Sequence, residues 1–293
     1  MESGWRSLNI INANYWSSED VYMRIMTRVR YLYKRIEVKL KRWKPAGTDF
    51  TILHDDAFLV SYPKSGNTWL RFLLGQARLA RPLDFTSIES VIPDIYQNSD
   101  RELLRVSRPR VLKSHEMYSD LYPKVIYLVR DPRDVAISFY YWRKKTGVFK
   151  IRGLDLSLAD YLKQHFAEKE FAYASGWGEH VESWMEQAPF LGNRLLTLKY
   201  EDVEQSPEKA LQRVVEFLGW EISDSAMVFS VKYSEANRMR KAEAVLPMSK
   251  RQDIPFVREA RSGQWREVFD SKLNAIYWER FGKWMEKFEY DKH

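Results

Sequence analysis

Short apolar runs that alternate with helical segments constrain the fold of this chain more than any other feature of its sequence. Four runs have the composition of buried strands: 57–62 (AFLVSY), 110–114 (RVLKS), 125–130 (VIYLVR) and 195–200 (LLTLKY). Helices are expected between and after them, over 69–80, 134–142, 157–170 and 207–218. Strands separated by helices predict an α/β fold of three layers, with a mainly parallel central sheet covered by helices on both faces.

Residues that start and stop helices support two of these boundaries. Ser157 opens a capping box, and Ser206 is expected to cap the helix that Pro207 begins and Gly219 ends. The stretch 241–263 lacks periodicity, and we expect it to be a long functional loop.

Composition excludes several classes of protein. The chain has 293 residues, of which 45% are hydrophobic and 30% charged, as in an ordinary globular protein and unlike a disordered one. No apolar run approaches the roughly 18 residues of a membrane-spanning helix, and the N-terminus has no basic and apolar leader. The absence of cysteine excludes disulfides, zinc–thiolate sites and cysteine nucleophiles, and it fits a reducing compartment. We therefore expect a cytoplasmic protein.

The net charge of +7 is concentrated near the N-terminus. Nine Lys or Arg residues and one acid, Glu37, lie between Val21 and Lys44, a local excess of +8, so the rest of the chain carries about −1. A nearly neutral body argues against a general nucleic-acid-binding surface, and we expect no nucleic-acid partner.

The basic segment has the pattern of an amphipathic helix. Its apolar residues recur at steps of three and four: Tyr22, Met26, Val29, Tyr33, Ile36, Leu40 and Trp43. Such a helix either packs its apolar stripe on the body of the protein or makes peripheral contact with an anionic membrane through residues 21–44. We expect residues 1–47 to form this helical segment and residues 48–293 to form one domain.

The segment from Tyr62 to Trp69 (YPKSGNTW) combines a lysine, a glycine and hydroxyl groups between a strand and a helix. Free backbone amides and the helix dipole favour an anion at the start of a helix. Gly66 allows close approach to the backbone, and Lys64 supplies a charge. The ATP-type loop GxxxxGK[ST] is absent. The segment is either a different anion cradle or an ordinary strand–helix turn.

Polar residues follow the strand at 110–114 in the segment KSHE, from Lys113 to Glu116. Ligands of open α/β sheets bind beyond the carboxyl ends of the strands. His115 could act there as a general base, because the pKa of histidine lies near neutrality, although a lone histidine is more often structural. Lys113, two residues earlier, would project to the same side as His115.

Two further segments could bind an anion. The segment LVRDPRDVAIS places Arg130 at a strand end and Ser138 one turn into the next helix, where both could reach one phosphate. The alternative is an ion pair between Arg130 and Asp134, with Ser138 on the helix surface. The segment 258–266 (REARSGQWR) is a basic loop that could close over an anion.

In this order and spacing, the four segments resemble the sulfotransferases that use 3′-phosphoadenosine 5′-phosphosulfate (PAPS), in particular the cytosolic small-molecule branch and its bacterial relatives. The resemblance covers about 57–269. YPKSGNTW is similar to the family's 5′-phosphosulfate loop, LVRDPRDVAISFYY to its 3′-phosphate strand and helix, KSHE to its lysine-x-histidine element, and RSGQW to its C-terminal loop. It implies the sulfotransferase fold, which is related to that of P-loop nucleotide kinases, and transfer of a sulfuryl group from PAPS to an acceptor hydroxyl without a metal.

The resemblance also implies a role for each matching residue. Lys64 would contact the bridging and 5′-phosphate oxygens, His115 would take the acceptor proton, and Lys113 would stabilise the transferring group. The other nucleotide contacts would come from Ser65, Gly66, Asn67 and Thr68 in the loop, Trp69 and Tyr200 at adenine, and Arg130, Ser138 and Arg258 at the 3′-phosphate. A segment from Gly176 to Trp184 resembles a family helix that we expect to be mainly structural.

The chain departs from the family pattern at three places. Glu259 and Ala260 stand where the family has lysine and glycine, and an acid beside a phosphate lowers affinity unless it points away. Arg261 could compensate. Glu116 stands where many small-molecule enzymes have leucine, and it is a second candidate for the base because carbohydrate-directed relatives use a glutamate. The dimer motif of animal members is not matched, so we do not expect that dimer, and the sequence predicts no other oligomeric state.

The acceptor is expected to be the hydroxyl group of a small molecule, a lipid or a sugar. Two other functions remain as alternatives. An ATP-dependent small-molecule kinase is disfavoured by the missing GxxxxGK[ST] loop. A non-enzymatic membrane or scaffold module with a degenerate nucleotide site is favoured by Glu259 and Ala260 alone.

Overall fold

The computed structural model describes residues 49–149, 156–164, 176–244 and 257–292. The predicted basic helix over 21–44 and the predicted boundary after residue 47 lie outside these residues and stay predictions.

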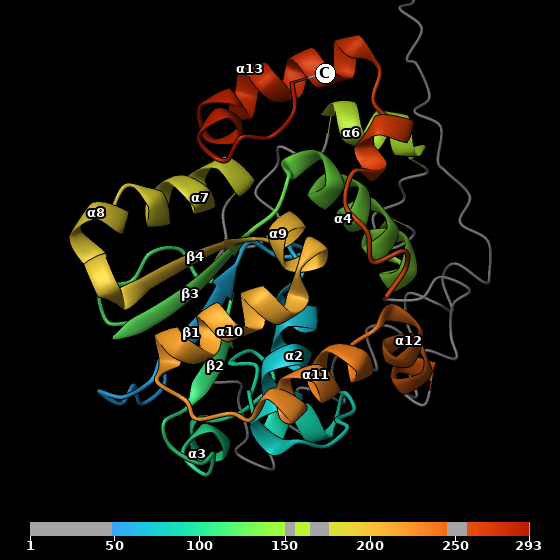
Figure 1. Cartoon of the computed structure of the whole chain (residues 1–293). Coiled ribbons are helices and arrows are strands. Elements are labelled where there is room, and N and C mark those ends of the chain that lie inside the picture. Colours follow the sequence, from blue (N-terminus) through green and yellow to red (C-terminus); the bar gives the residue numbers. More distant parts are fainter. Residues whose placement is uncertain (1–48, 150–155, 165–175, 245–256, 293) are drawn as a thin grey trace, which may run out of the picture. The chain divides into compact units, whose positions relative to one another are not determined.

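Four parallel strands form the central sheet of the described chain, in the order β2-β1-β3-β4 (Figure 1). The strands are β1 Ala57–Ser61, β2 Val111–Ser114, β3 Lys124–Val129 and β4 Leu195–Lys199. Each predicted strand boundary lies within one residue of the observed one. The prediction of a mainly parallel sheet is therefore confirmed.

Helices connect and cover the strands. They are α2 Asn67–Leu79, α3 Asp100–Leu103, α4 Pro132–Thr146, α6 Leu158–Gln164, α7 Trp177–Met185, α8 Ala188–Leu191, α9 Tyr200–Gln205, α10 Pro207–Leu218, α11 Asp224–Tyr233, α12 Ala236–Ala244 and α13 Ser271–Lys287. Short 3₁₀ turns lie at η1 Ser87–Ser90, η2 Gly192–Arg194 and η4 Gln264–Glu267.

Alternation along the strands divides the core into two halves. Successive side chains of a strand point to opposite faces of the sheet. Phe58 of β1 and Tyr127 of β3 pack in one half with α4, α6, α7 and α13. Leu59 of β1 and Leu128 of β3 pack in the other half with α2 and α10. Helices therefore cover both faces (Figure 1), which confirms the three-layer prediction.

Several helix boundaries differ from the sequence prediction. Helix α4 begins at Pro132, two residues before the predicted start, because the side chain of Asp131 accepts a hydrogen bond from the backbone N–H of Arg133 at 2.9 Å. Ser157 caps α6 as predicted, with its Oγ accepting from the N–H of Asp160 at 3.1 Å.

Two predictions about the second half of the chain are wrong in part. Gly219 ends α10 with φ 68°, but the side chain of Ser206 makes no capping hydrogen bond. Ser206 also ends α9, where its backbone N–H donates to the carbonyl of Asp202, and its ψ of 73° differs from the extended backbone of a usual N-cap. The predicted loop over 241–263 is helical at its start, because α12 continues to Ala244.

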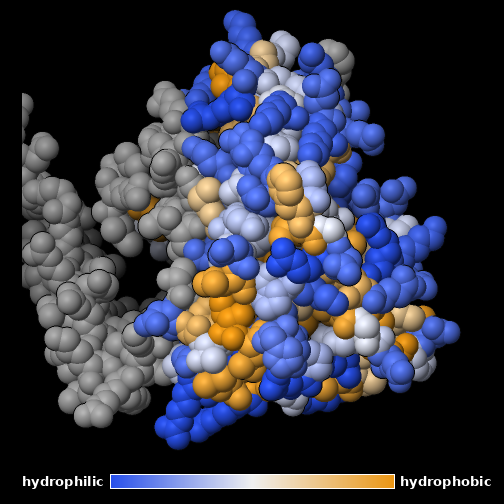
Figure 2. All heavy atoms as spheres, turned by 90° about the vertical axis from the view of Figure 1, so that its left-hand side faces the viewer, coloured by the Kyte–Doolittle hydropathy of each residue, from blue (hydrophilic) through white to orange (hydrophobic). Residues whose placement is uncertain are grey.

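None of the described helices combines the length and the apolar composition that crossing a bilayer requires. The face that includes α8 carries groups of apolar residues set among hydrophilic ones (Figure 2).

Candidate active site

The loop between β1 and α2 contains two residues in the left-handed region of backbone space. Lys64 has φ 71° and Gly66 has φ 96°. A Cβ atom on Gly66 would lie 2.3 Å from Cδ2 of Tyr200, so only glycine lets the tyrosine ring rest against this backbone. Helix α2 follows at once, and the first N–H groups of a helix point back toward the residues that precede it. This backbone conformation is compatible with the predicted anion cradle.

Two buried polar side chains, one in this loop and one at the start of α2, each have an atom without a hydrogen-bond partner among the described residues. Nδ2 of Asn67 donates to the carbonyl oxygen of Leu59 at 3.1 Å and to Oγ of Ser61 at 3.2 Å, which ties the start of α2 to β1. Oδ1 of Asn67 and Oγ of the fully buried Ser65 have no hydrogen-bond partner within the described residues. An anionic oxygen could accept a bond from the Ser65 hydroxyl. Thr68 is half-buried in the same turn.

Lys64 lies among several cations. The pKa of its ammonium group falls to about 7, chiefly because the group is buried and further because of the charges of Arg130, Lys113 and Lys145, while Glu243 opposes this shift. An anion bound beside Lys64 would restore its charge. The structure thus brings together three of the predicted site residues, Lys64, Lys113 and Arg130.

Tyr200 joins the loop to the second anion-binding segment. Its ring rests against Gly66, and Cζ of Arg130 lies 4.1 Å from the ring centroid. The ring of Trp69 lies 5.6 Å from that of Tyr200, and its Nε1 donates to the carbonyl of Ser234 at 3.0 Å. Residues expected at the two ends of one nucleotide therefore surround a single tyrosine ring.

Arg130 directly follows β3, and its guanidinium group includes a buried donor without a partner among the described residues. Its Nη2 donates to the carbonyl oxygen of Arg261 at 2.8 Å. The ion pair of the alternative interpretation is present but long, at 3.9 Å from Nη2 to Oδ2 of Asp134. Nε of Arg130 is buried and has no hydrogen-bond partner among the described residues, so it is available to an oxyanion. Ser138 is half-buried on the following helix, α4.

Asp134 attaches the C-terminal loop to this site. Its Oδ2 accepts from the N–H of Gly263 at 2.6 Å, and its Oδ1 accepts from the N–H of Trp265 at 3.0 Å. Burial raises the pKa of this carboxyl group, and the charge of Arg130 opposes the shift. The fourth predicted segment therefore meets the third.

Arg258 reaches the same helix from the C-terminal loop. Its Cζ lies 4.3 Å from the ring centroid of Tyr141 on α4. Its guanidinium group also contacts Glu259 and Gln264. Glu259 is partly exposed and is paired with both Arg258 and Arg261. The acid that departs from the family pattern is thus neutralised within its own loop.

His115 follows β2, and its ring is fixed through Nδ1. This atom lies 2.6 Å from the carbonyl oxygen of Ser61. Because a carbonyl oxygen only accepts, Nδ1 carries the proton, and Nε2 keeps the lone pair that a base needs. The pKa of His115 falls to about 3, chiefly through burial and next through the charge of Lys113, so the ring is neutral at neutral pH.

Lys113 is already paired with an acid. Its Nζ forms an ion pair with Oδ2 of Asp94, and only 12% of the Lys113 side chain is exposed. The charge of Lys113 nevertheless lowers the pKa of both Lys64 and His115. Lys113 therefore lies beside the other predicted catalytic residues, with its ammonium group held by Asp94.

Glu116, the second candidate for the base, has a different environment. Its Oε1 accepts from the hydroxyl of Tyr96 at 2.7 Å, and burial raises its pKa. The same hydroxyl accepts from the backbone N–H of His115 at 3.1 Å. Tyr96 therefore links the two candidates.

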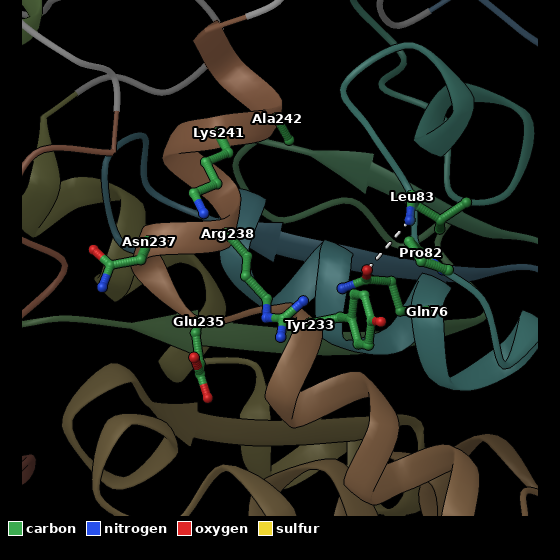
Figure 3. Close-up of a pocket in the computed structure, with 9 residues that line it drawn as sticks. All are labelled: Gln76, Pro82, Leu83, Tyr233, Glu235, Asn237, Arg238, Lys241 and Ala242. Carbon is green, nitrogen blue, oxygen red and sulfur yellow. Dashed lines mark hydrogen bonds between the residues drawn. The ribbon is translucent and has the colours of Figure 1, made fainter.

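A surface pocket of about 480 Å³ lies at the junction of α2, α11 and α12 (Figure 3). Gln76 lines this pocket, and its Nε2 donates to Oγ of Ser234 at 2.7 Å. The carbonyl oxygen of the same serine accepts the hydrogen bond from Trp69. Arg238 lies over the ring of Tyr233 at 4.3 Å. Among the described residues, none of the predicted catalytic or nucleotide-binding side chains lines this pocket.

The structure adds residues that sequence reasoning did not assign to the site. Ser61 and Asp94 hold His115 and Lys113, and Lys145 pairs with Glu243 beside Lys64. A position at the end of a predicted strand was the signal available for Ser61; the other contacts join distant segments and had no local signal. Within the described residues, no group of three or more His, Asp or Glu side chains could hold a metal ion.

Comparison with known sequences identifies one family. The model of the sulfotransferase domain matches residues 54–289. Sulfotransferase 1B1 of Mus musculus is 28% identical over 289 residues, which cover 89% of this chain and 93% of that protein. Sulfotransferase 1A1 of Bos taurus is 27% identical over 257 residues, which cover 79% of this chain and 83% of that protein.

Solved structures agree with this result. A mouse sulfotransferase, SULT7A1, complexed with PAP is similar with a TM-score of 0.63 and 25% identity, over 82% of this chain and 87% of that chain. A retinol dehydratase in complex with androsterone and PAP has a TM-score of 0.62 and 20% identity, over 84% of each chain, and this likeness extends to the fold alone. With the matching domain spanning most of its length, the chain belongs to the sulfotransferase family.

Proposed function

We propose that this protein transfers a sulfuryl group from PAPS to an acceptor hydroxyl by direct in-line attack, with His115 as the general base. The observation that carries the proposal is the position of Tyr200, which rests against Gly66 and faces Arg130 at 4.1 Å. A donor with phosphate groups at both ends of one nucleoside needs two neighbouring anion sites, and these two segments supply them.

The side chains present suit that nucleotide. The buried Oγ of Ser65 and Nε of Arg130 are donors without partners among the described residues. Lys64, Asn67 and Thr68 would complete the 5′ cradle with Gly66. Trp69 and Tyr200 would enclose the adenine, and Arg130, Ser138 and Arg258 would hold the 3′-phosphate.

The chemistry follows from the charges of these groups. PAPS supplies the sulfuryl group, whose bond to the bridging phosphate oxygen breaks as the acceptor oxygen bonds to sulfur. Lys64 would neutralise the charge that develops on the bridging oxygen, and Lys113 would add to the positive potential. Nε2 of His115 would accept the hydroxyl proton, since Nδ1–H is engaged by Ser61. By analogy with phosphoryl transfer, where a loose transition state leaves mainly positioning and charge stabilisation to the protein, these cations would supply what Mg²⁺ supplies in kinases.

The acceptor is proposed to be a small molecule, a lipid or a sugar alcohol. Peripheral membrane contact through residues 21–44 would favour an amphiphilic alcohol. Flotation of the full chain with anionic phosphatidylserine vesicles tests that contact, and absence of binding would remove it.

Labelled donor tests the reaction. The full chain is incubated with ³⁵S-labelled PAPS and a host extract, and the labelled product is identified. We expect His115→Ala to lower turnover by about 10²–10⁴-fold, the usual contribution of a general base, with the affinity for PAP preserved. Glu116→Gln serves as the comparison for the second candidate base. Unchanged turnover in His115→Ala would refute the base assignment.

Nucleotide selectivity separates the alternatives. Calorimetry with PAP and with ATP should show tighter binding of PAP. Preference for ATP would support a kinase, and failure to bind either nucleotide would support a non-enzymatic module.

A further inference from the structure

Three ring N–H groups of helix α7 contact backbone carbonyl groups that directly follow β2 and β3. Nε1 of Trp177 donates to the carbonyl of Arg130 at 3.1 Å, and Nε1 of Trp184 donates to the carbonyl of Glu116 at 3.1 Å. Between them, Nε2 of His180 lies 3.2 Å from the carbonyl of His115. Residues 177, 180 and 184 share one helix face, so a single rigid element holds the backbone of both the proposed base and the proposed 3′-phosphate ligand.

The two nitrogens of His180 have distinct partners. Its side chain is fully buried, and burial lowers its pKa to about 4, so the ring is neutral at neutral pH. The carbonyl of His115 can only accept, so Nε2 carries the proton. Nδ1 then accepts from the hydroxyl of Tyr127, at 2.9 Å. Both nitrogens are satisfied, and the tautomer is opposite to that of His115.

We propose that His180 is a positioning residue for the sulfuryl transfer: its Nε2–H···O=C bond fixes the backbone of His115 and thereby aims Nε2 of that imidazole at the acceptor hydroxyl. The proposal rests on the proposed function, because it requires His115 to be the base. The ring of His115 is anchored by the Ser61 carbonyl, and its backbone is anchored by the His180 ring at the carbonyl and by the Tyr96 hydroxyl at the N–H. Loss of the His180 bond would free the carbonyl side of this backbone, and a misplacement of about 1 Å can reduce turnover by about 10²-fold.

Replacement of His180 by glutamine or by asparagine, whose side chains are both neutral amides, provides a matched test of the positioning role. The amide nitrogen of glutamine reaches the place of Nε2, whereas that of asparagine reaches only the place of Nδ1. We expect His180→Gln to stay within about threefold of the wild-type kcat and His180→Asn to lose about 10- to 100-fold, with the Kd for PAP unchanged in both. Tyr127→Phe removes the bond on the other nitrogen, and it should reduce stability without this loss of kcat.

A double-mutant cycle distinguishes positioning from general damage. In a His115→Ala background, His180→Asn should lower kcat no further, because the base that it positions is gone. A further loss of the same size, or a normal kcat for His180→Asn alone, would overturn the positioning role. A low kcat for His115→Ala together with a normal kcat for His180→Asn would refute only this inference. A normal kcat for His115→Ala would refute the assignment of His115 as the base.

A measurement on the wild type decides the matter if the variants fail to fold. Nitrogen-15 NMR of the five histidines should show His180 protonated at Nε2 and His115 protonated at Nδ1. Protonation of His180 at Nδ1 would remove the donor that the proposal requires.

Discussion

Oδ2 of Asp134 accepts a hydrogen bond from the backbone N–H of Gly263 at 2.6 Å, although the two residues lie 129 positions apart. Oδ1 of the same carboxylate accepts from Trp265. Because Asp134 lies in the first turn of α4 and is four residues after Arg130, this contact sets the C-terminal loop beside the proposed 3′-phosphate site. One side chain thus makes a distant loop part of the proposed nucleotide site.

Asp134→Ala should weaken both the loop and nucleotide binding. Two charge-assisted hydrogen bonds are lost, and each is worth about 1.5–3 kcal/mol, so we expect a stability loss of about 3–6 kcal/mol and an increase of at least about tenfold in the Kd for PAP. Calorimetry and denaturant unfolding measure the two effects. Asp270→Ala is the control, because it removes the hydrogen bond from the N–H of Leu273 that caps α13. It should lower the free energy of unfolding and leave the Kd for PAP unchanged. Equal effects of both substitutions on PAP binding would contradict the role of Asp134.

Gly66→Ala should be far more damaging than Gly219→Ala. Both glycines have positive φ, so each substitution carries the left-handed penalty of about 1–2 kcal/mol. At Gly219 nothing lies within 4 Å of the added methyl group, whereas at Gly66 it would lie 2.3 Å from Tyr200. We therefore expect loss of PAP binding only for Gly66→Ala. Calorimetry that finds normal affinity in this variant would show that Tyr200 can move away.

Nucleotide binding should take up a proton at Lys64. Its pKa of about 7 in the free protein leaves it mostly neutral at mildly alkaline pH, and a bound phosphate favours the charged form. At about pH 8 we expect an uptake approaching one proton per PAP, measured by calorimetry in buffers of different ionisation enthalpy. Lys64→Arg should bind PAP with much less uptake, since arginine is always charged. Equal uptake in both proteins would place the proton elsewhere.

Stability should fall as the pH is lowered through the histidine range. The folded pKa values of His115 and His180, about 3 and about 4, lie below the ordinary value of 6.5. At pH values between the folded pKa and 6.5, the unfolded chain therefore binds more protons than the folded protein does. Stability is lost as the pH falls from about 6.5 toward 4. Glu201 opposes this trend because burial raises its pKa to about 7.

A variant isolates the contribution of one ring. Between about pH 7 and pH 4.5, the wild type should lose about 2–3 kcal/mol more stability than His115→Gln does. The reason is that each pKa unit by which folding lowers the pKa of His115 corresponds to about 1.36 kcal/mol. Urea unfolding at both pH values gives the comparison. If wild type and variant lose the same stability, His115 is not buried as a neutral ring.

The strands could be predicted from the sequence because buried parallel strands are continuous apolar runs that end in polar loops. The run 57–62 is β1 but for its last residue. Helix α13 also has a local signal in the sequence. Asp270 caps it, and Leu273, Tyr277 and Phe281 recur at steps of four on its buried face.

The motifs of the site could be predicted, but not the contacts between them. Lys64, His115 and Arg130 stand in local patterns of strand, polar loop and helix. The pairing of Lys113 with Asp94 depends instead on how a loop packs across the sheet, and nothing near either residue specifies it. The same holds for Asp134 and the C-terminal loop.

The order of the strands has a consequence for how such a protein can change. Under the proposed assignment, the donor is held by loops that leave β1 and β3, which lie in the interior of the described sheet, whereas the base leaves β2 at its border. Beyond β2, the sheet is continued by the segment 93–95, where the N–H of Lys113 donates to the carbonyl of Pro93 and the N–H of Ile95 donates to the carbonyl of Lys113. Substitutions in this outer segment can alter the surroundings of the proposed base without touching the strands that carry the proposed nucleotide loops.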